Sequence, residues 1–555
     1  MAKIIKTGLD AKKAIKAGVD KVADIVKVTM GPTGKAVILE KSYGSPTITD
    51  DGVTVAKDIE LEDKFENIGA SLIQEVANKT NDEAGDGTTT ATVLAQKMIE
   101  EGFAAAALNS TRALEIKKGM DKAVKYVVEE LQKMKKDIKT KSEIEQVATI
   151  ASLDSEVGKL IAEVMDEVGN DGVITVEEGQ TIGLEKEVVK GMRFDKGYVS
   201  PYMVTNPERM LAEVNDPYIF VTDQKISSIQ EIVPLLEKVI QSGKKDIVII
   251  AEEIEGEALA TFLVNKIKGT FNVLAVKAPG FGERKKEMLS DIATLTGAQV
   301  ISEELGLKLE SAQMEHLGRA RKVIADKENT TIVDGMGEKE KIEARITQIR
   351  QQIGSSTSDF DKEKLQERLA KLVGGVGVIK VGAFTETEMK TKKFKIEDAL
   401  NATKAAVQEG IIPGGGSALA KIAPKLDTFA ASLGDAEKAG VRVVRRSLEA
   451  PLRQIAENSG IEVTGILGAI QSGDDTLGYD FSHASETNWK DGLVDMIKAG
   501  IVDPTKVTRL ALENAVSIAS TLITTEAIVA DKPEKNSSAG GHGMPGGMDM
   551  GGMGM

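Results

Sequence analysis

The chain has 555 residues, too many for a single hydrophobic core, so roughly two to four domains are expected. Apolar residues (41%) and charged residues (28%) occur in the proportions of a soluble globular protein. The 86 acidic and 71 basic residues give a formal charge of -15, which argues against a nucleic-acid partner because no net basic surface is available. With no cysteine and three histidines, the chain excludes disulfides and thiol catalysis and disfavours zinc sites.

No feature of the sequence predicts a membrane span or an export signal. A transmembrane helix needs about 18 or more consecutive apolar residues, and no such run occurs. Residues 1–6 lack the apolar region of a signal peptide. We therefore expect a cytoplasmic protein with no membrane partner.

The amino-terminal part is predicted to be mainly helical. An amphipathic pattern covers 9–29 and ends at a Gly/Pro turn signal. The other elements expected before residue 137 are helices at 64–84, 88–108 and 113–136 and short strands at 36–39 and 47–49.

The pattern changes after residue 172. Brief apolar runs at 173–176, 219–222, 247–250 and 273–276 alternate with helical segments, which predicts an α/β unit. Residues 338–371 are strongly charged and are expected to form solvent-exposed helices. The last elements expected are a strand at 376–381, helices at 396–408 and 505–523, and a disordered Gly/Met tail at 537–555.

The most informative motif is the run Asp86, Gly87, Thr88, Thr89 and Thr90, directly before a helical pattern. At a helix N-terminus, unpaired backbone N–H groups and the positive end of the helix dipole favour a bound phosphate. Gly87 lets the backbone approach that phosphate, and the Asp86 carboxylate offers the hard oxygen that magnesium prefers. The alternative is an ordinary capped helix start, because Asp and Thr are also good N-caps.

Other motifs stand in register with this one. They are Thr29 to Pro32, the helix around Asp398, Gly414 to Gly416, Asp503 to Val507 and the Gly/Met tail. Together the motifs resemble the group I chaperonins of the GroEL type, over nearly all 555 residues. In register, they are far more specific than any one alone.

The resemblance implies a multidomain α and α/β subunit. A mainly helical equatorial ATP-binding domain would comprise 1–136 and 410–525, and a small α/β intermediate hinge domain would comprise 137–190 and 376–409. An α/β apical domain would be inserted at 191–375, and 526–555 would form the carboxy-terminal segment. Gly191, Gly374, Gly375 and Gly410 lie at these implied boundaries, where glycine absorbs large φ/ψ changes, so hinge motion is expected.

The resemblance also implies that the equatorial domain binds ATP with magnesium and potassium. Asp86 would bind magnesium, potassium would lie near Thr29, and Asp398 would position the water that attacks the terminal phosphate. From its position alone, Asp398 would be a favourable charge at the start of the 396–408 helix. The implied nucleotide-binding residues are Thr29, Met30, Gly31, Pro32, Asp50, Asp86, Gly87, Thr88, Thr89, Thr90, Ile150, Gly414, Gly415, Asp480, Phe481, Ser482 and Asp503.

Two positions depart from the family pattern. Asp50 stands where bacterial members commonly carry a lysine beside the phosphates. The loop containing Asp480, Phe481 and Ser482 is bulkier than the small-residue version associated with the family.

A surplus of apolar residues marks the implied apical domain. Val233 and Leu236 share one helical face, and Leu235 and Val239 share a neighbouring one. A partly exposed helix needs only one such stripe for its core, although burial on both faces is equally compatible with the pattern. By resemblance, the groove that binds clients and the lid comprises Tyr198, Tyr202, Met203, Val233, Leu236, Leu259, Leu263 and Val264; Met203 replaces a more usual aromatic residue.

The function implied by the resemblance is ATP-dependent folding of non-native client proteins. Identical subunits would form seven-membered rings, two of them stacked back to back, and a GroES-type co-chaperonin would close the chamber. One alternative is a chaperonin-fold scaffold or moonlighting protein with little ATP turnover, which Asp50 makes conceivable. Another is a small-molecule kinase, which is disfavoured because no acceptor-substrate pocket is visible in the sequence.

Overall fold

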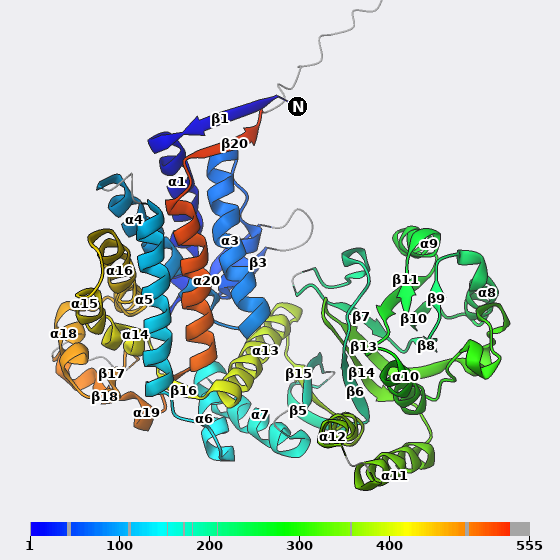
Figure 1. Ribbon diagram of the computed structural model, residues 1–555. Coiled ribbons are helices and arrows are strands. Elements are labelled where there is room, and N and C mark those ends of the chain that lie inside the picture. Colours follow the sequence, from blue (N-terminus) through cyan, green and yellow to red (C-terminus); the bar gives the residue numbers. More distant parts are fainter. Residues whose placement is uncertain are drawn as a thin grey trace, which may run out of the picture.

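The computed structural model describes residues 2–40, 46–108, 113–152, 154–169, 172–179, 181–207, 209–355, 358–482 and 488–532. The predicted class, a multidomain α and α/β fold, is confirmed, with helices at both ends of the chain and sheets in between (Figure 1). The disordered tail predicted at 537–555 lies outside the described residues. Within the described residues, no helix combines the length and the apolar character of a membrane span.

Both ends of the chain build one helical bundle. Its long helices are α1 (Gly8–Val26), α3 (Lys64–Ala84), α4 (Thr88–Leu108), α5 (Ala113–Met134) and α20 (Thr505–Ile523). They share a core to which Ile15, Leu94 and Leu512 contribute, each fully or almost fully buried. Outside the bundle, β1 (Lys3–Thr7) pairs antiparallel with β20 (Ala527–Asp531), a pairing that the sequence pattern did not indicate (Figure 1).

Shorter elements surround this bundle. Before α3 they are η1 (Lys27–Thr29), β2 (Val37–Leu39), β3 (Thr47–Thr49) and α2 (Gly52–Asp58). After residue 410 they are β16 (Ile411–Pro413), α14 (Ser417–Ile422), α15 (Lys425–Ala430), α16 (Asp435–Ser447), α17 (Ala450–Asn458), α18 (Thr464–Ser472), β17 (Leu477–Tyr479), η8 (Trp489–Gly492), β18 (Leu493–Asp495), α19 (Met496–Ala499) and β19 (Val502–Pro504).

The central segment, residues 191–375, is organised around a seven-stranded mixed sheet. The strand order is β12 (Asn272–Lys277), β10 (Asp246–Ala251), β8 (Tyr218–Val221), β13 (Gly318–Ala325), β14 (Asn329–Gly335) and β6 (Gly191–Asp195), with β7 (Ala212–Asn215) also paired to β13. The first three strands are parallel, and they contain the apolar runs predicted at 219–222, 247–250 and 273–276. Such continuous apolar runs suit parallel strands because both of their faces are buried.

Helices and short turns cover this sheet. The helices are α8 (Val233–Gln241), α9 (Gly256–Ile267) and α10 (Glu283–Thr296). The remaining short elements are η3 (Pro201–Met203), β9 (Lys225–Ile226), η4 (Ile229–Glu231), β11 (Glu253–Ile254), η5 (Glu303–Leu305), η6 (Leu309–Ser311) and η7 (Met314–His316). In Figure 1, α8 and α9 lie at the edge of the central segment that is far from the helical bundle.

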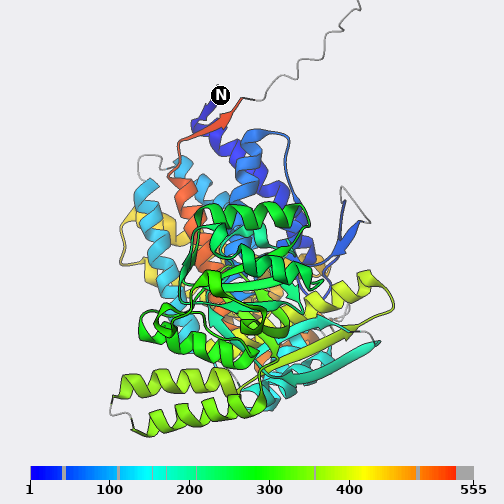
Figure 2. The same ribbon diagram turned by 90° about the vertical axis from the view of Figure 1, so that its right-hand side faces the viewer.

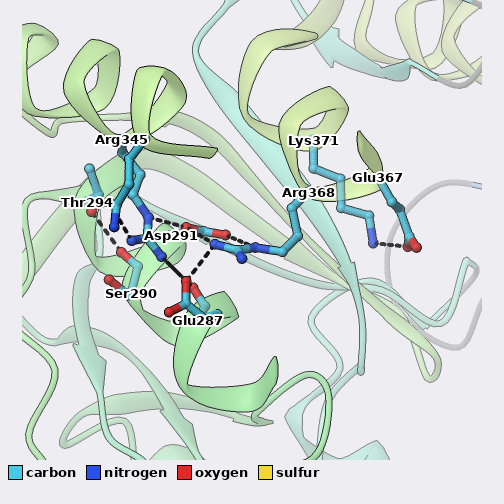
Figure 3. A network of polar contacts seen from close by, with 9 residues as sticks. Glu287, Ser290, Asp291, Thr294, Arg345, Glu367, Arg368 and Lys371 are labelled. Atoms are coloured by element: carbon cyan, nitrogen blue, oxygen red, sulfur yellow. Dashed lines mark hydrogen bonds and ion pairs between the residues drawn. The ribbon is translucent and has the colours of Figure 1, made fainter. Parts of the chain in front are cut away.

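The charged stretch predicted as solvent-exposed helices forms α11 (Lys339–Ser355) and α12 (Asp359–Val373), which lie side by side (Figure 2). Their inner face is held to α10 by the Asp291 network, in which the fully buried Asp291 carboxylate accepts hydrogen bonds from Arg345 and Arg368 (Figure 3). The side chain of each arginine is only 11% exposed, so part of this charged pattern reflects a buried network rather than a solvated face.

A smaller α/β unit lies between the bundle and the central segment (Figure 1). Its strands are β4 (Val173–Glu178), β15 (Val376–Gly382) and β5 (Gly183–Val189), with β15 in the middle, and its helices are α6 (Lys141–Ser152), α7 (Ser155–Val168) and α13 (Glu386–Glu409). The predicted start of the last helix at 396 is wrong. The helix begins at Glu386 because Thr385 caps it and the i,i+4 pairs of Glu386 with Lys390 and Glu388 with Lys392 support a first part without apolar periodicity.

The chain crosses between these units at two pairs of adjacent segments. At one crossing, Lys136 and Ile411 form a bridge, and a Cβ on Gly410 would lie 2.7 Å from the Lys136 carbonyl oxygen. At the other, a Cβ on Gly375 would lie 2.7 Å from the Val189 carbonyl oxygen. Gly410 and Gly375 also have positive φ angles of 78° and 65°, so both positions require glycine.

Candidate functional site

The turn between α3 and α4 positions the Asp86 motif. Gly85 ends α3 in the left-handed conformation, and α4 begins at Thr88, as predicted. A Cβ on Gly85 would lie 2.5 Å from the Asn401 side chain, so α13 packs directly on this turn. Gly87 has a φ of 81°, and a Cβ there would lie 2.4 Å from the Val507 side chain. Both glycines are therefore fixed by close packing as well as by backbone conformation.

The end of α1 lies beside this turn. The Thr29 hydroxyl donates to the Val26 carbonyl at 2.9 Å and lies 3.5 Å from the Thr89 hydroxyl. The Asn458 amide donates to the carbonyls of Lys27 and Met30 at 2.9 and 2.8 Å, which fixes the turn that follows. Thr29 and Thr89, which are 60 residues apart in sequence, therefore present their hydroxyls at one place.

A strand pair brings the glycine run to Asp503. β16 and β19 are antiparallel with Ile412 opposite Asp503, so the turn after β16 folds over the Asp503 carboxylate. That carboxylate accepts hydrogen bonds from the backbone N–H groups of Gly415 and Gly416. A Cβ on Gly414 would lie 3.0 Å from the Ile501 carbonyl oxygen, which keeps this residue small. Burial, with a contribution from Asp86, raises the pKa of Asp503 to about 7.

A cavity of about 300 Å³ opens between these segments. Ten of its lining residues were predicted as nucleotide contacts, namely Met30, Gly31, Pro32, Thr90, Ile150, Gly415, Asp480, Phe481, Ser482 and Asp503. The rings of Tyr479 and Phe481 lie 4.7 Å apart and form part of one wall. Thus the bulkier loop lines the cavity with aromatic surface, which suits a planar base.

A second cavity, of about 410 Å³, lies between α13 and the segment from β3 to α2. Asp50, Asp51, Thr54, Lys395 and Asp398 line it. The Asp50 carboxylate lies 3.2 Å from the Lys395 ammonium, and both side chains are 46% exposed. Asp50 is thus paired with a basic residue of α13.

Asp51 is a member of this group that the sequence analysis did not identify. Its carboxylate caps α2 by accepting from the backbone N–H groups of Val53 and Thr54. It also contributes to the negative potential that raises the pKa values of Asp86 and Asp398. The sequence analysis predicted no helix at 52–58, so it indicated neither this cap nor the proximity of Asp51 to Asp398.

Asp398 lies in the middle of α13, so its interpretation as a charge at a helix start is wrong. The Arg209 Nη1 atom donates to the Asp398 Oδ1 atom at 3.3 Å, and Arg209 Nε lies 3.2 Å from Glu397 Oε2. Burial raises the pKa of Asp398 well above its usual range, Arg209 lowers it, and Asp51 and Asp86 raise it further. The sequence analysis did not identify Arg209, because it belongs to the central segment and meets α13 only in the folded chain.

Asp86 fits a magnesium ion that takes most of its ligands from a bound phosphate. Its carboxylate accepts only the Gly87 N–H among the hydrogen bonds described, and burial raises its pKa to about 6. The described residues contain no cluster of three or more His, Cys, Asp or Glu side chains placed to hold a metal. Magnesium is commonly held by one or two carboxylates together with substrate phosphates, so a lone buried carboxylate beside a phosphate turn suits it.

The predicted client-binding residues occupy one side of the central segment but differ in exposure. Tyr202 (76%) and Val264 (47%) are exposed, and Val233, Leu259 and Leu263 are partly buried. The other three, Tyr198, Met203 and Leu236, are buried in the core of the segment. Leu236 was expected to share an exposed face of α8 with Val233, yet both faces of this helix contribute buried residues, namely Leu236 on one and Leu235 and Val239 on the other. Two further exposed apolar side chains, Ile240 and Ile267, lie on α8 and α9.

The sequence of residues 22–533 matches the TCP-1/cpn60 chaperonin family. The chain belongs to this chaperonin family. Members are generally ATP-binding ATPases that form oligomeric rings and bind client proteins. For this chaperonin, the match places both ends of the chain, the small α/β unit and the central segment within one family architecture.

Proposed function

We propose that this chaperonin is of group I, the GroEL type, and that it hydrolyses ATP to drive the folding of non-native proteins. The observation that carries the proposal is the convergence of both chain ends on the 300 Å³ cavity: Asp503 lines it, Asp86 lies close enough to raise the pKa of Asp503, and the pKa values of both carboxylates are raised. Buried carboxylates without a cationic partner favour a bound cation. A nucleotide with its magnesium satisfies this requirement and fills a cavity of this shape.

Different residues of the chain would bind the base, the phosphates and the metal ions. The aromatic wall of Phe481 and the loop at 480–482 would hold the base, and the backbone N–H groups at the start of α4 would bind phosphate oxygens. Asp86 would hold magnesium, which neutralises charge on the phosphates when bound. The hydroxyls of Thr29 and Thr89 would offer hard oxygens to potassium.

Asp398 would act on the attacking water. Phosphoryl transfer depends mainly on in-line positioning and charge neutralisation, so one carboxylate that orients water governs much of the rate. A raised pKa brings this carboxylate closer to the operating pH of a proton acceptor. Asp50 takes no part in neutralising phosphate in this scheme because its carboxylate is itself negatively charged; it pairs with Lys395 instead.

We assign three domains on the basis of the three largest hydrophobic cores among the described residues. The equatorial domain comprises 1–136 and 410–525, the intermediate domain 137–190 and 376–409, and the apical domain 191–375. Motion would occur at the crossings that carry Gly191, Gly374, Gly375 and Gly410. ATP shifts the population toward a raised apical domain only if that state binds it more tightly.

The apical surface would bind clients and the co-chaperonin lid. Exposed apolar side chains on α8, α9 and η3 are the kind of patch that binds unfolded chains by area rather than by sequence. Its exposed members are Tyr202 and Val264, with Val233, Leu259 and Leu263 beside them. The assembly would comprise two seven-membered rings of this chain in the cytoplasm, closed by a GroES-type lid.

The test is ATP hydrolysis by the purified assembly with magnesium and potassium, combined with refolding of an aggregation-prone client. We expect Asp398→Ala to reduce turnover by at least about 100-fold while nucleotide binding persists. The matched control is Asp427→Ala. This substitution removes a carboxylate of α15 that is 61% exposed and pairs with Arg445. It should leave hydrolysis unchanged.

Two results would contradict the proposal. A wild-type assembly that holds clients but neither binds nor hydrolyses ATP would instead be a scaffold. Unchanged hydrolysis in Asp398→Ala would remove Asp398 from the catalytic assignment. Native mass measurement of the assembly distinguishes a ring from the monomer expected of a small-molecule kinase.

A further inference from the structure

Among the described hydrogen bonds and ion pairs, Arg209 is the residue of the central segment that contacts Asp398. The Arg209 side chain is 14% exposed and contacts both Glu397 and Asp398 of α13. Its guanidinium carbon lies 4.4 Å from the centre of the Phe394 ring, one turn earlier on the same helix. Three side chains of one helix therefore hold one arginine of another unit.

Arg209 lies in a turn whose backbone conformation is constrained by hydrogen bonds. Asn206 and Leu211 form an isolated bridge that closes a turn, and the Arg209 backbone N–H donates to the Asn206 side chain at 3.3 Å. Met210 has a φ of 52°, which is unfavourable for a residue with a side chain and is found where surrounding structure enforces it. The turn leads directly into β7, which pairs with β13 of the central sheet, so Arg209 moves with that sheet.

The guanidinium of Arg209 is only partly hydrogen-bonded in its contact with α13. Among the residues that the structure describes, the buried Arg209 Nη2 atom has no hydrogen-bond partner. A fully satisfied arginine would favour a permanent contact, whereas an arginine with one unpaired buried N–H group is less stable in place. Three residues before Asp398 on α13, Lys395 lines the same cavity and pairs with Asp50 of the segment between β3 and α2. The middle of α13 therefore forms ion pairs in two directions: Glu397 and Asp398 pair with Arg209 of the central segment, and Lys395 pairs with Asp50.

We propose that Arg209 is a positioning residue that holds Asp398 in a resting arrangement and releases it when the central segment lifts away from α13. This inference rests on the function proposed above and concerns the regulation of the same site. While Arg209 occupies the Asp398 Oδ1 atom, that oxygen is not free to orient water. Because Arg209 is fixed to the central sheet, departure of the sheet removes it and frees the carboxylate. ATP hydrolysis is thereby coupled to the position of the client-binding surface.

The first test is steady-state ATP hydrolysis by the full assembly carrying Arg209→Met. Removing the contact should shift the population toward the released state, so kcat rises by up to about tenfold while KM changes little. The matched control is Arg319→Met, since Arg319 pairs with Asp216 inside the central segment. That control should leave kcat and KM unchanged.

Two further variants separate positioning from a general structural effect. Glu397→Gln keeps Asp398 and removes one of the two carboxylates that hold Arg209, so kcat should rise in the same direction but less. Arg209→Lys keeps a charge without the two-point geometry of a guanidinium and should lie between wild type and Arg209→Met. A graded series of this kind is not expected from a destabilised fold.

Amide hydrogen exchange without nucleotide tests the contact independently of catalysis. Exchange in 204–211 and 394–400 should increase in Arg209→Met and Glu397→Gln and remain unchanged in Arg319→Met. If the wild-type assembly fails to hydrolyse ATP, the proposed function is lost, but this measurement still decides whether Arg209 holds the two segments together.

Three outcomes would overturn the inference. A kcat in Arg209→Met reduced tenfold or more would make Arg209 a group that assists hydrolysis rather than one that restrains it. Unchanged kcat in that variant would mean that the contact does not restrain Asp398. Unchanged exchange in 394–400 would mean that Arg209 does not hold α13.

Discussion

Two arginine–carboxylate contacts in this chaperonin use the same chemistry in different settings. In the Asp291 network, the carboxylate accepts from Arg345 Nε at 2.7 Å and from Arg368 Nε and Nη2 at 2.8 and 3.0 Å (Figure 3). In the Arg209 contact, Asp398 accepts one bond at 3.3 Å, and one arginine nitrogen has no partner among the described residues. All members of the Asp291 network belong to the central segment, whereas the Arg209 contact joins two units.

The difference shows that burial of an ion pair does not by itself indicate its role. A carboxylate with short bonds to two arginines stabilises one arrangement, because breaking any bond leaves a buried charge unpaired. A carboxylate with a single longer bond, beside other carboxylates that oppose its charge, can exchange that partner for another. The first suits a rigid part of the central segment, and the second suits a contact that breaks during a conformational change.

The largest effect expected from this comparison is on stability. Asp291→Asn should destabilise the central segment by about 3 kcal/mol, because both arginines lose the charge of a fully buried carboxylate and keep only Glu287, which is 41% exposed, as a charged partner. Denaturant unfolding should show an early transition, with amide exchange in 339–373 rising first. The proposed ATP hydrolysis should persist, because none of Glu287, Asp291, Arg345 and Arg368 lines the 300 Å³ or the 410 Å³ cavity.

The matched variant in the other contact is Asp398→Asn. It should change the free energy of unfolding by less than about 1 kcal/mol, because Glu397 still pairs with Arg209 and burial, which raises the pKa of Asp398, already disfavours the charge that the substitution removes. If Asp291→Asn and Asp398→Asn destabilised the protein equally, the Arg209 contact would contribute to stability as the Asp291 network does, and the proposed difference between them would be wrong.

A smaller effect is expected at Asp503, which has neither arginine nor lysine as a partner in the described contacts. Burial raises its pKa from 3.8 to about 7, so the folded protein binds more protons than the unfolded chain between these values. The contribution of this group to stability therefore falls as pH rises, and the penalty is fully present above about pH 7. Asp503→Asn should stabilise the nucleotide-free protein at pH 8 by about 2 kcal/mol, after discounting for partial exposure.

Thermal unfolding of wild type and Asp503→Asn across the range from pH 5 to about 8 tests this expectation. The difference in stability should shrink steadily as the pH is lowered. A difference that grows at low pH would reverse the sign and show that Asp503 is stabilised as a carboxylate in the folded protein.

The smallest effect is expected at the exposed pair of Asp50 and Lys395. Lys395→Met should change the free energy of unfolding by less than about 1 kcal/mol, because both side chains are 46% exposed and solvent screens the pair. The melting temperature should differ from wild type only at low salt. A large change in the melting temperature that persists at high salt would show that the Asp50–Lys395 pair contributes to stability as a buried ion pair does.

The sequence predicted the helices of the bundle because their apolar residues recur at helical spacing and their ends carry turn signals. The helices expected at 64–84 and 88–108 coincide with α3 and α4. The prediction failed at 386–395, where the helix is supported by charge pairs and a cap rather than by an apolar stripe. It also gave no indication of β1, since that strand is stabilised only by pairing with a strand more than 500 residues away.

For the candidate site, the local turns could be predicted and the contacts between them could not. Gly87 was expected to allow close approach, and the structure places the Val507 side chain against it. Asp51 and Arg209 were missed because their importance comes from a third residue, Asp398, that is far from both in sequence, 189 positions from Arg209. Exposure was also misjudged for Met203, which is fully buried although its segment is apolar and near the surface.

The amino-acid sequence by itself determined most helical segments, the turn between α3 and α4 and the family of the chain, since periodicity, turn chemistry and motif spacing are local properties. Only the tertiary structure decided which carboxylates share one cavity and which arginine holds Asp398. The physical reason is that burial and charge proximity, which set the pKa values and the ion pairs, depend on distances between segments that the chain brings together only on folding.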